Sequence, residues 1–342
     1  MRLALEPRRL PFRTPIVTAY ATYEDRELDL VQVTDRDGVT GLGEAAPLEP
    51  FDGVSLDSVR AEIEGCRSIL AADDASPAEL RAACRRACSL PHAVAALDVA
   101  LWDLEARRAG RPLAARLSPE PREEVTVNAF VDAAEPGEAS RAAGEAARAG
   151  FRCVKVKVGV GDDSGRLAAV REAVGPRVAI RIDANGAWSP DEAVAALRAL
   201  APARIELCEE PTPGVAGIRA VRAALAGAVA VALDESAREP GALTAGGADA
   251  VCLRVGACGG ITGVLRDAAL ARSLGADVYV ASTFDGPVGV AAGLHVAAAL
   301  RVARPCGLAT LPLFADVDDP FPPQDGVIRL PTTPGLGVAS DA

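Results

Sequence analysis

Short apolar runs and longer alanine-rich stretches alternate through the middle of the chain. Runs rich in Val and Ile recur about every 25 residues, a spacing typical of strands that alternate with helices. Eight such runs are present, at 125–131, 153–159, 178–183, 204–210, 229–234, 250–255, 277–282 and 306–314. The stretches between them have the spacing of helices, most clearly at 138–149, 166–174, 190–200 and 260–274.

Strands that alternate with helices form βαβ units and a parallel sheet. Eight units over roughly 190 residues favour an α/β fold of the (β/α)8, or TIM-barrel, type over an open doubly wound sheet. The open sheet would carry a glycine-rich phosphate loop after its first strand, and neither G-x-G-x-x-G nor G-x-x-x-x-G-K-[ST] occurs there. Helix boundary signals support this alternation of strands and helices. Ser189 and Pro190 are typical of a helix start, and Gly150 and Gly275 are typical of helix ends.

The first part of the chain has a different pattern. Two runs, 28–34 and 41–44, predict strands of a meander, and 55–70 and 78–106 predict helices. We therefore expect an α+β domain with a linking helix at 1–120, a catalytic barrel at 121–315, and a tail at 316–342 that returns toward the first domain.

Composition narrows the classes of function. The chain has 342 residues, with 36 Lys+Arg against 47 Asp+Glu, or −11. An acidic balance argues against nucleic acid or an anionic membrane as the main partner. The longest apolar runs, 223–233 and 286–300, are shorter than the ~20 residues of a membrane span, and no targeting segment is recognisable. We expect a cytoplasmic protein whose eight cysteines, none in a CxxC pair, are reduced and packed as small apolar side chains.

Carboxylates stand at the ends of three successive predicted strands: Asp183, Glu209 and Asp234. A barrel places its chemistry at the C-terminal ends of its strands, so these three acids are expected to converge. Each alone would more often be a helix cap or a solvated loop residue. Together they would repel one another unless a cation lay among them, and oxygen ligands select a hard ion, Mg²⁺ or Mn²⁺.

Basic residues flank this acidic set. Lys155 and Lys157 share a face of the second strand, and Arg254 ends the sixth. A divalent ion that binds a substrate carboxylate would stabilise an enediolate after loss of the α-proton, with Lys157 as the base and Lys155 as part of the positive field. Asn185 shares the face of Asp183 and is expected to support it.

Several motifs of the chain are similar to those of the enolase superfamily, and within it the muconate lactonizing enzyme subgroup. They are Gly43-Glu44-Ala-Ala-Pro47, Ala96-Leu-Asp98-Val-Ala-Leu-Trp102-Asp103, Lys155-x-Lys157, Asp183-Ala-Asn185, Glu209-Glu-Pro211, Asp234-Glu235 and Gly259-Gly260-Ile261-Thr262. The resemblance covers nearly the whole chain. It implies that Lys157 is the base, that Asp183, Glu209 and Asp234 are the metal ligands, and that a capping-domain loop at about 12–21 closes over a small carboxylate substrate.

Substrate-binding candidates follow by position only: Arg13 and Thr14 in the expected loop, and Ser282 and Thr283 at the seventh strand. The mandelate racemase branch of the family uses a His–Asp dyad on late strands. Here His92 falls in the region of the linking helix and His295 in an alanine-rich helix, so both are expected to be structural.

The main departure from the subgroup is Arg254, which stands where a second lysine is usual. A guanidinium stays protonated and is a poor base. Epimerisation needs a base on each face of the enediolate, whereas a syn-elimination needs one, so Arg254 favours elimination or cycloisomerisation. The segments 43–51 and 306–310 also resemble those of o-succinylbenzoate synthases, the Mg²⁺-dependent dehydratases of menaquinone biosynthesis.

Other functions stay open at this stage. A dipeptide epimerase, an N-acylamino acid racemase or a muconate-type cycloisomerase would use the same residues, and Asp316-Val-Asp318 could hold a substrate ammonium although it lies beyond Thr310. Outside catalysis, the chain could be a carboxylate-binding barrel or a structural module. Exposed alanine-rich helices are compatible with a homo-oligomer.

Overall fold

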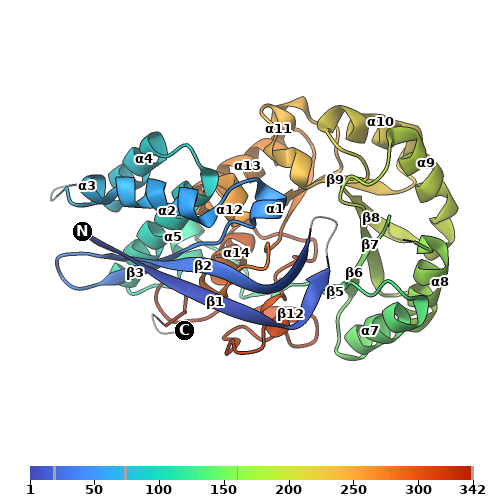
Figure 1. The fold of residues 1–342 in the computed structure, drawn as a ribbon, viewed down its shortest axis with the longest axis horizontal. Coiled ribbons are helices and arrows are strands. Elements are labelled where there is room, and N and C mark those ends of the chain that lie inside the picture. Colours follow the sequence, from blue (N-terminus) through green and yellow to red (C-terminus); the bar gives the residue numbers. More distant parts are fainter. Residues whose placement is uncertain (18–20, 73–74, 160, 340–342) are drawn as a thin grey trace.

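The computed structural model describes residues 1–17, 21–72, 75–159 and 161–339, and it divides into a capping domain and a barrel (Figure 1). The capping domain has a sheet of three strands and a layer of helices. Its elements are β1 (Arg2–Val17), β2 (Thr22–Thr34), β3 (Thr40–Ala45), α1 (Glu49–Asp52), α2 (Leu56–Gly65), α3 (Arg67–Leu70), α4 (Pro77–Ala87), α5 (Pro91–Arg108) and α6 (Leu113–Leu117).

The antiparallel sheet has the order β1-β2-β3. The sequence pattern predicted β2 and β3 but not β1, which contains Pro7, Pro11 and Pro15. Proline cannot donate to a strand ladder and is tolerated on edge strands, and β1 stands at the edge of this sheet, next to β2. The register shifts between Pro11 and Ile16, where the strand bends.

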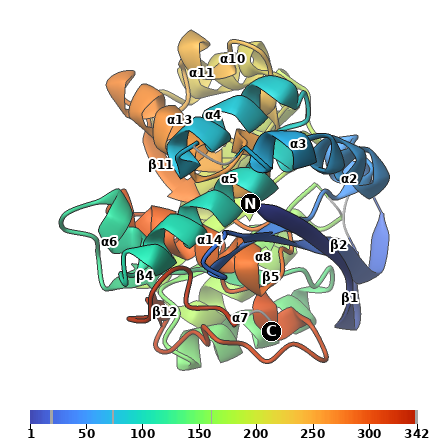
Figure 2. The same ribbon diagram turned by 90° about the vertical axis from the view of Figure 1, so that its left-hand side faces the viewer.

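Helix α5 joins the two domains. Its side chains are buried almost all round, because β3 covers one side and the barrel helices α12 and α13 another (Figure 2). The contact with β3 is very close: a Cβ atom at Gly41 or Gly43 would overlap the carbonyl oxygen of Ala100 or Ala96. These two glycines therefore let backbone lie directly against backbone.

The barrel strands form a parallel sheet with the order β11-β10-β9-β8-β7-β6-β5. Its strands are β5 (Ala129–Val131), β6 (Cys153–Lys157), β7 (Ala179–Asp183), β8 (Ile205–Glu209), β9 (Ala230–Leu233), β10 (Ala250–Leu253) and β11 (Asp277–Val280). The helices around it are α7 (Pro136–Arg148), α8 (Asp163–Val174), α9 (Pro190–Ala199), α10 (Val215–Leu225), α11 (Ala242–Ala245), α12 (Val255–Cys258), α13 (Ile261–Ser273) and α14 (Pro287–Ala299), with 3-10 turns η1 (Ala201–Ala203) and η2 (Glu235–Arg238). The α/β barrel with a capping domain is as predicted.

The ring closes through single bridges. Cys306 bridges Val127 and Gly307 bridges Ala281, both parallel. The predicted eighth strand, 306–314, is thus shorter than expected, and its end forms the 3-10 turn η3 (Leu311–Leu313). The predicted first strand, 125–131, is split into β4 (Glu124–Thr126) and β5, because β4 pairs antiparallel with β12 (Val327–Arg329) of the C-terminal segment.

Carboxylates of the capping domain bind the N-termini of barrel helices. Glu44 accepts hydrogen bonds from the backbone of Gly286 (2.8 Å) and Gly289 (3.3 Å) at the start of α14. Asp98 on α5 accepts one from Thr262 (3.0 Å) at the start of α13. A helix N-terminus presents unpaired N–H groups and a positive dipole end, so these contacts hold the two domains in register.

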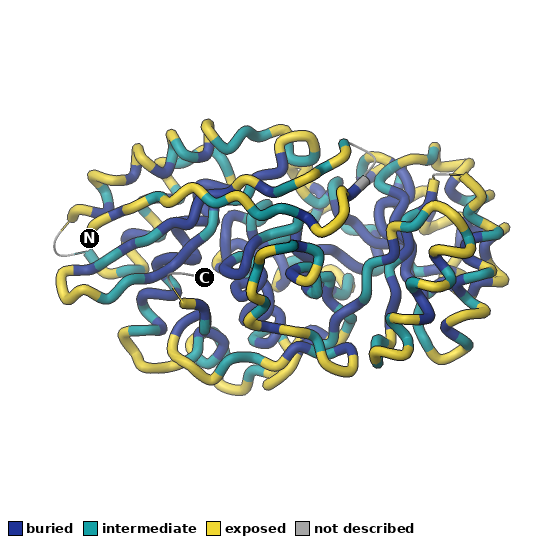
Figure 3. Tube along the Cα trace, turned by 60° about the horizontal axis from the view of Figure 1, so that its bottom comes forward, coloured by how far each residue is buried: buried dark blue, intermediate teal, exposed yellow. Residues whose placement is uncertain are grey.

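Buried residues run through the centre of the barrel and between the capping sheet and its helices (Figure 3). The C-terminal segment packs on α5, since Asp103 accepts a hydrogen bond from the backbone of Leu336 (2.7 Å). Within the described ranges, no helix combines the length and the apolar character needed to cross a membrane.

His295 on α14 is fully buried and joins three segments. Its Nδ1 accepts from the backbone of Ala114 (3.0 Å), and its Nε2 lies 3.2 Å from the carbonyl oxygen of Leu336. The first bond requires a neutral ring that donates from Nε2. Burial lowers the pKa of His295 to about 4.

We predict that His295 makes stability depend on pH. Because its folded pKa lies below the unfolded value, its contribution is complete above pH 6.5 and is lost as the pH falls toward 4; at pH 4.5 the loss is roughly 2.5 kcal/mol. Urea unfolding at pH 7.5 and 4.5 should show that His295→Gln loses less stability on acidification than the wild type. Equal losses in both proteins would contradict the assignment.

Candidate active site

The strand register aligns charged side chains at the C-terminal end of the barrel. Lys157 on β6 pairs with Asp183 on β7, and Asp183 pairs with Glu209 on β8. Asp234 follows β9 and Arg254 follows β10. The parallel sheet therefore places these five residues along one rim, as the sequence predicted.

Two cations hold the three carboxylates. Lys155 Nζ lies 2.9 Å from Asp183 Oδ2 and 2.8 Å from Glu209 Oε1. Arg254 binds Asp234 through two nitrogens, with Nε 2.7 Å from Oδ1. Arg254 also donates to the Ser282 carbonyl oxygen at 2.7 Å, which ties β10 to the loop after β11.

These contacts set the protonation of the site. Burial opposes the charge of Lys155, yet Asp183 and Glu209 outweigh it and raise the pKa of Lys155 well above its usual value. In the same way, burial is outweighed by Asp234, which raises the pKa of Arg254. Lys157 differs: burial, with the charge of Lys155, lowers its pKa although Asp183 acts in the opposite direction. Lys157 is thus the amine of this rim that most readily loses its proton.

The donor set fits a divalent cation. Glu209 is fully buried, and its Oε2 has no hydrogen-bond partner in the described structure. Burial raises the pKa of Glu209 to about 7, although Lys155 acts in the opposite direction. Asp183, Glu209 and Asp234 offer only oxygen, the ligand of hard cations, and this acidic centre is the kind of site that holds one.

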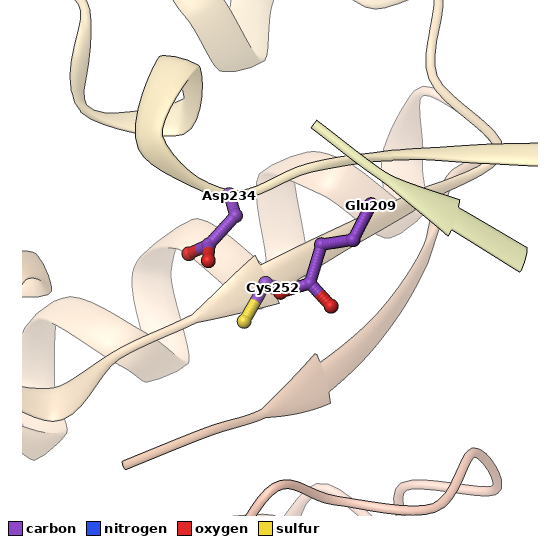
Figure 4. Close-up of side chains that lie close together, drawn as sticks. All are labelled: Glu209, Asp234 and Cys252. Atoms are coloured by element: carbon purple, nitrogen blue, oxygen red, sulfur yellow. The ribbon is translucent and has the colours of Figure 1, made fainter. Parts of the chain in front are cut away.

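Cys252 on β10 also borders this centre. One ligand atom each from Glu209, Asp234 and Cys252 lies within 4.8 Å of the others, and all three side chains are buried (Figure 4). Burial, with the charge of Asp234, keeps the pKa of the thiol well above its usual value, so it is an uncharged neighbour of the two acids. The sequence pattern suggested only an apolar strand residue here.

A pocket of about 790 Å³, its open mouth included, lies above the charged rim. The capping domain contributes Tyr23, Leu48 and Phe51 to its wall, and the barrel contributes Phe130 and Phe284. Lys155, Lys157, Asp183, Asn185 and Arg254 form its polar floor. The pocket therefore suits a ligand with a charged group at one end and an apolar body at the other.

The segment of Phe51 is fixed to the barrel by Asp52. The Asp52 carboxylate accepts from Arg238 (2.8 Å), from the backbone of Leu48 (2.7 Å) and from His92 (3.3 Å). Phe51 lies under two guanidinium groups, with Arg254 Cζ 5.2 Å and Arg238 Cζ 4.5 Å from its ring centroid. His92 is thus a structural contact of the capping domain.

Of the remaining predicted site residues, some line the pocket and others lie outside it. Asn185, Ser282 and Thr283 line the pocket. Asn185 donates to Asp183 Oδ1 through its backbone (3.0 Å) and to Glu235 through its side chain (2.9 Å). Its φ of 44° is strained for a residue other than glycine, a cost that often marks functional turns.

Arg13 and Thr14 do not line this pocket. Both are exposed on β1, and Arg13 Nε donates to the carbonyl oxygen of Pro312 at 3.0 Å. The expected capping loop at 12–21 is therefore strand as far as Val17, while residues 18–20 lie outside the described part of the chain, as do residues 340–342 of the tail. The strand bends toward the barrel here, and Phe12 stacks on Phe314 at 4.7 Å.

Sequence reasoning missed most of the pocket wall. Tyr23, Phe130 and Phe284 stand far apart in the sequence, and nothing in their local pattern marks them. Leu48 and Phe51 had a signal, because they follow Gly43-Glu44-Ala-Ala-Pro47 directly. The structure shows why that motif matters: Glu44 binds α14, and the residues after it reach the pocket.

The architecture is that of a capped barrel with its acidic centre at the strand ends. A family profile described as the mandelate racemase / muconate lactonizing enzyme N-terminal domain matches residues 3–117, and one described as enolase C-terminal domain-like matches residues 138–342. The chain therefore belongs to the mandelate racemase/muconate lactonizing enzyme group of the enolase superfamily.

Similar proteins in this family differ in activity. An o-succinylbenzoate synthase from Thermobifida fusca is 42% identical over 219 residues, 60% of this chain and 67% of that one. An L-Ala-D/L-Glu epimerase from Bacillus subtilis is 31% identical over 97% of this chain and 94% of that one. The substrate-liganded structure of this epimerase superposes with a TM-score of 0.91 at 30% identity over 98% of both chains. A dipeptide epimerase from Enterococcus faecalis, complexed with Mg and L-Leu-L-Tyr, superposes with a TM-score of 0.90 at 25% identity over 99% of both chains.

We predict that the acidic centre binds a divalent cation. Because binding to the folded state alone stabilises it, Mg²⁺ at about 100 times its dissociation constant should add about 2.7 kcal/mol and raise Tm by a few degrees. Glu209→Gln should abolish this shift, whereas Asp191→Asn, on the exposed first turn of α9, should keep it. A Glu209→Gln protein that folds by circular dichroism and retains the full Mg²⁺ shift would rule Glu209 out as a ligand.

Proposed function

We propose that this enzyme catalyses a one-base dehydration, the reaction of o-succinylbenzoate synthases, with Mg²⁺ held by Asp183, Glu209 and Asp234. The observation that carries the proposal is the pair Lys157 and Arg254. Lys157 ends β6 and Arg254 directly follows β10, four strands away in a ring of eight positions, so they line the pocket from opposite sides. One side has an amine that can lose a proton and the other a guanidinium that cannot.

The lysine content of the chain supports this reading. Of its 36 basic residues only two are lysines, Lys155 and Lys157, and both lie in the pocket. Arginine therefore serves at every other basic position, and lysine stands where the chemistry needs a compact amine. An arginine at position 254 then indicates that no second removable proton is required on that side.

The pocket wall also favours this substrate class over a dipeptide. A dipeptide brings an ammonium group that would need an acid, and Asp183 is the one carboxylate among the pocket-lining residues of the described structure. Asp316 and Asp318, considered above for that task, are exposed and lie beyond η3, outside the pocket lining. Aromatic and aliphatic side chains fill the wall instead, as suits a carbocyclic ring.

The proposed reaction uses Lys157 twice. Its neutral amine removes the proton α to the substrate carboxylate, and the C–H electron pair moves into the enediolate. When that pair returns to form the C=C bond, the C–O bond on the same face breaks and the leaving hydroxide takes the proton from Lys157 as water. A bound Mg²⁺ would supply the positive charge that the dianionic intermediate needs. Lys155 and Arg254 hold the carboxylates in place.

The direct test compares two reactions in one preparation. With Mg²⁺, the cyclohexadiene precursor of o-succinylbenzoate should be dehydrated rapidly. L-Ala-L-Glu and N-succinyl amino acids in D₂O should show no deuterium incorporation with inversion, because no base faces the second side. Rapid epimerisation of the dipeptide with no dehydration would overturn the proposal.

That outcome defines the second candidate, a dipeptide or N-acylamino acid epimerase. The specific observation in its favour is the likeness to the L-Ala-D/L-Glu epimerase over nearly the whole chain. Arg254→Lys distinguishes the two mechanisms. If position 254 blocks the second face, this variant should gain slow α-proton exchange with inversion of N-succinyl amino acids, which the wild type lacks. A wild type that already inverts them at the variant's rate would place the second base elsewhere.

We predict that Lys157→Ala lowers turnover by about 10³-fold, the usual range for loss of a general base, while the Mg²⁺-induced rise in Tm is kept. A variant with wild-type turnover would show that another group is the base. A variant that loses the Mg²⁺ shift as well would point to a collapsed site, which circular dichroism would reveal.

The dependence of kcat/KM on pH is an independent test of Lys157 as the base. Since the neutral amine is the active form and its pKa lies below the usual lysine value, kcat/KM should rise with pH and level off below pH 10.5. Isotope labelling of lysine side chains would show only two signals by NMR, because the chain has two lysines. The signal that disappears in Lys157→Ala should titrate at the pH of the kinetic limb, and the Lys155 signal should not.

A further inference from the structure

Three cysteines of the capping domain gather outside the active site. Cys66 lies between α2 and α3, Cys84 on the last turn of α4, and Cys88 directly after α4. The Sγ atoms of Cys66 and Cys88 are 3.4 Å apart. The other five cysteines are spread over the barrel domain, at positions 153, 208, 252, 258 and 306.

The backbone around the Cys66–Cys88 contact is tied in place. The Glu62 carboxylate on α2 accepts hydrogen bonds from the backbone of Ser89 (3.0 Å) and Leu90 (2.8 Å), the two residues after Cys88. The end of α4 is thereby fastened to α2, and the two sulfurs face each other across this junction. A disulfide bond of about 2.05 Å requires the sulfurs to approach by little more than an ångström, which side-chain rotation can supply.

The three thiols also differ in exposure and in pKa, in a way that suits a thiol oxidation. Cys66 and Cys84 are each 1% exposed, whereas Cys88 is partly exposed, so an oxidant reaches the cluster beside Cys88. Hydrogen bonds from the thiols of Cys84 and Cys88 lower the pKa of Cys66. A thiolate is the nucleophile in such reactions, and the thiol contacts of Cys66 favour its thiolate form.

We propose that Cys66 and Cys88 form a reversible disulfide when the enzyme meets a peroxide. The Cys66 thiolate attacks one oxygen of hydrogen peroxide, the O–O bond breaks, and the departing hydroxide takes the Cys88 proton as water. The Cys88 thiolate then attacks the Cys66 sulfenic acid, the S–O bond breaks, and the second hydroxide leaves as water with a solvent proton. Two thiols lose two electrons and one peroxide becomes two waters.

A disulfide here is favoured over a metal at the same cysteines. Within the described ranges, the three ligand atoms that come together tightly enough for a metal belong to Glu209, Asp234 and Cys252, not to this cluster. The bond would instead close a loop between positions 22 residues apart and join the ends of α2 and α4. Its effect is to stabilise the capping domain's helical layer against unfolding.

The test uses the intact native enzyme. After brief exposure to an equimolar amount of hydrogen peroxide and alkylation of free thiols, peptide mass spectrometry without reductant should find Cys66 linked to Cys88. Dithiothreitol should reverse the link. The oxidised protein should melt roughly 5 °C higher than the reduced one, given the loop length and the size of the chain.

Variants separate this cluster from general oxidation. Cys88→Ser, or Cys88→Ala if the first folds poorly, should remove both the link and the rise in Tm. Cys258→Ser, which removes the partly exposed thiol of the barrel domain, should leave both unchanged. Free alkylation of Cys66 and Cys88 after peroxide, a link from Cys66 to Cys84 instead, or a linked protein with unchanged Tm would each overturn the proposal.

Discussion

Three carboxylates buried at the ends of neighbouring strands are the constraint on which the rest of this structure depends. Asp183, Glu209 and Asp234 could not be buried together without compensating charge. Lys155 supplies it to two of them and Arg254 to the third. The unpartnered oxygen of Glu209 marks where compensation is incomplete, and a divalent cation fits that deficit.

The same constraint explains why the basic residues of the site differ in how readily they lose a proton. Lys155 and Arg254 are committed to carboxylates and stay charged, so neither can exchange a proton at ordinary pH. Lys157 faces the pocket next to them, and its lowered pKa follows from burial and from the charge of its neighbour Lys155. The chain has no lysine besides Lys155 and Lys157.

The capping domain contributes to this chemistry through contacts remote from the reacting atoms. Glu44 and Asp98 bind the N-termini of α14 and α13, and Asp52 binds Arg238 of the barrel. These contacts bring Leu48 and Phe51 over the charged rim, where their apolar side chains lower the local dielectric and strengthen the electrostatic interactions below. The cysteine cluster lies in the helical layer behind this arrangement, so its oxidation would stabilise the domain without touching the pocket.

The sequence by itself determined the alternation of strands and helices, the acids at the strand ends and the basic residues beside them. It could do so because the periods of apolar residues and the register of a parallel sheet are local rules, and they carry Asp183, Glu209 and Asp234 to one rim. Only the tertiary structure decided the rest. Strand β1 was hidden by its prolines, which an edge position tolerates. The pocket wall draws Tyr23, Phe130 and Phe284 from remote segments, and Cys66 meets Cys88 through the packing of helices, which no local pattern encodes.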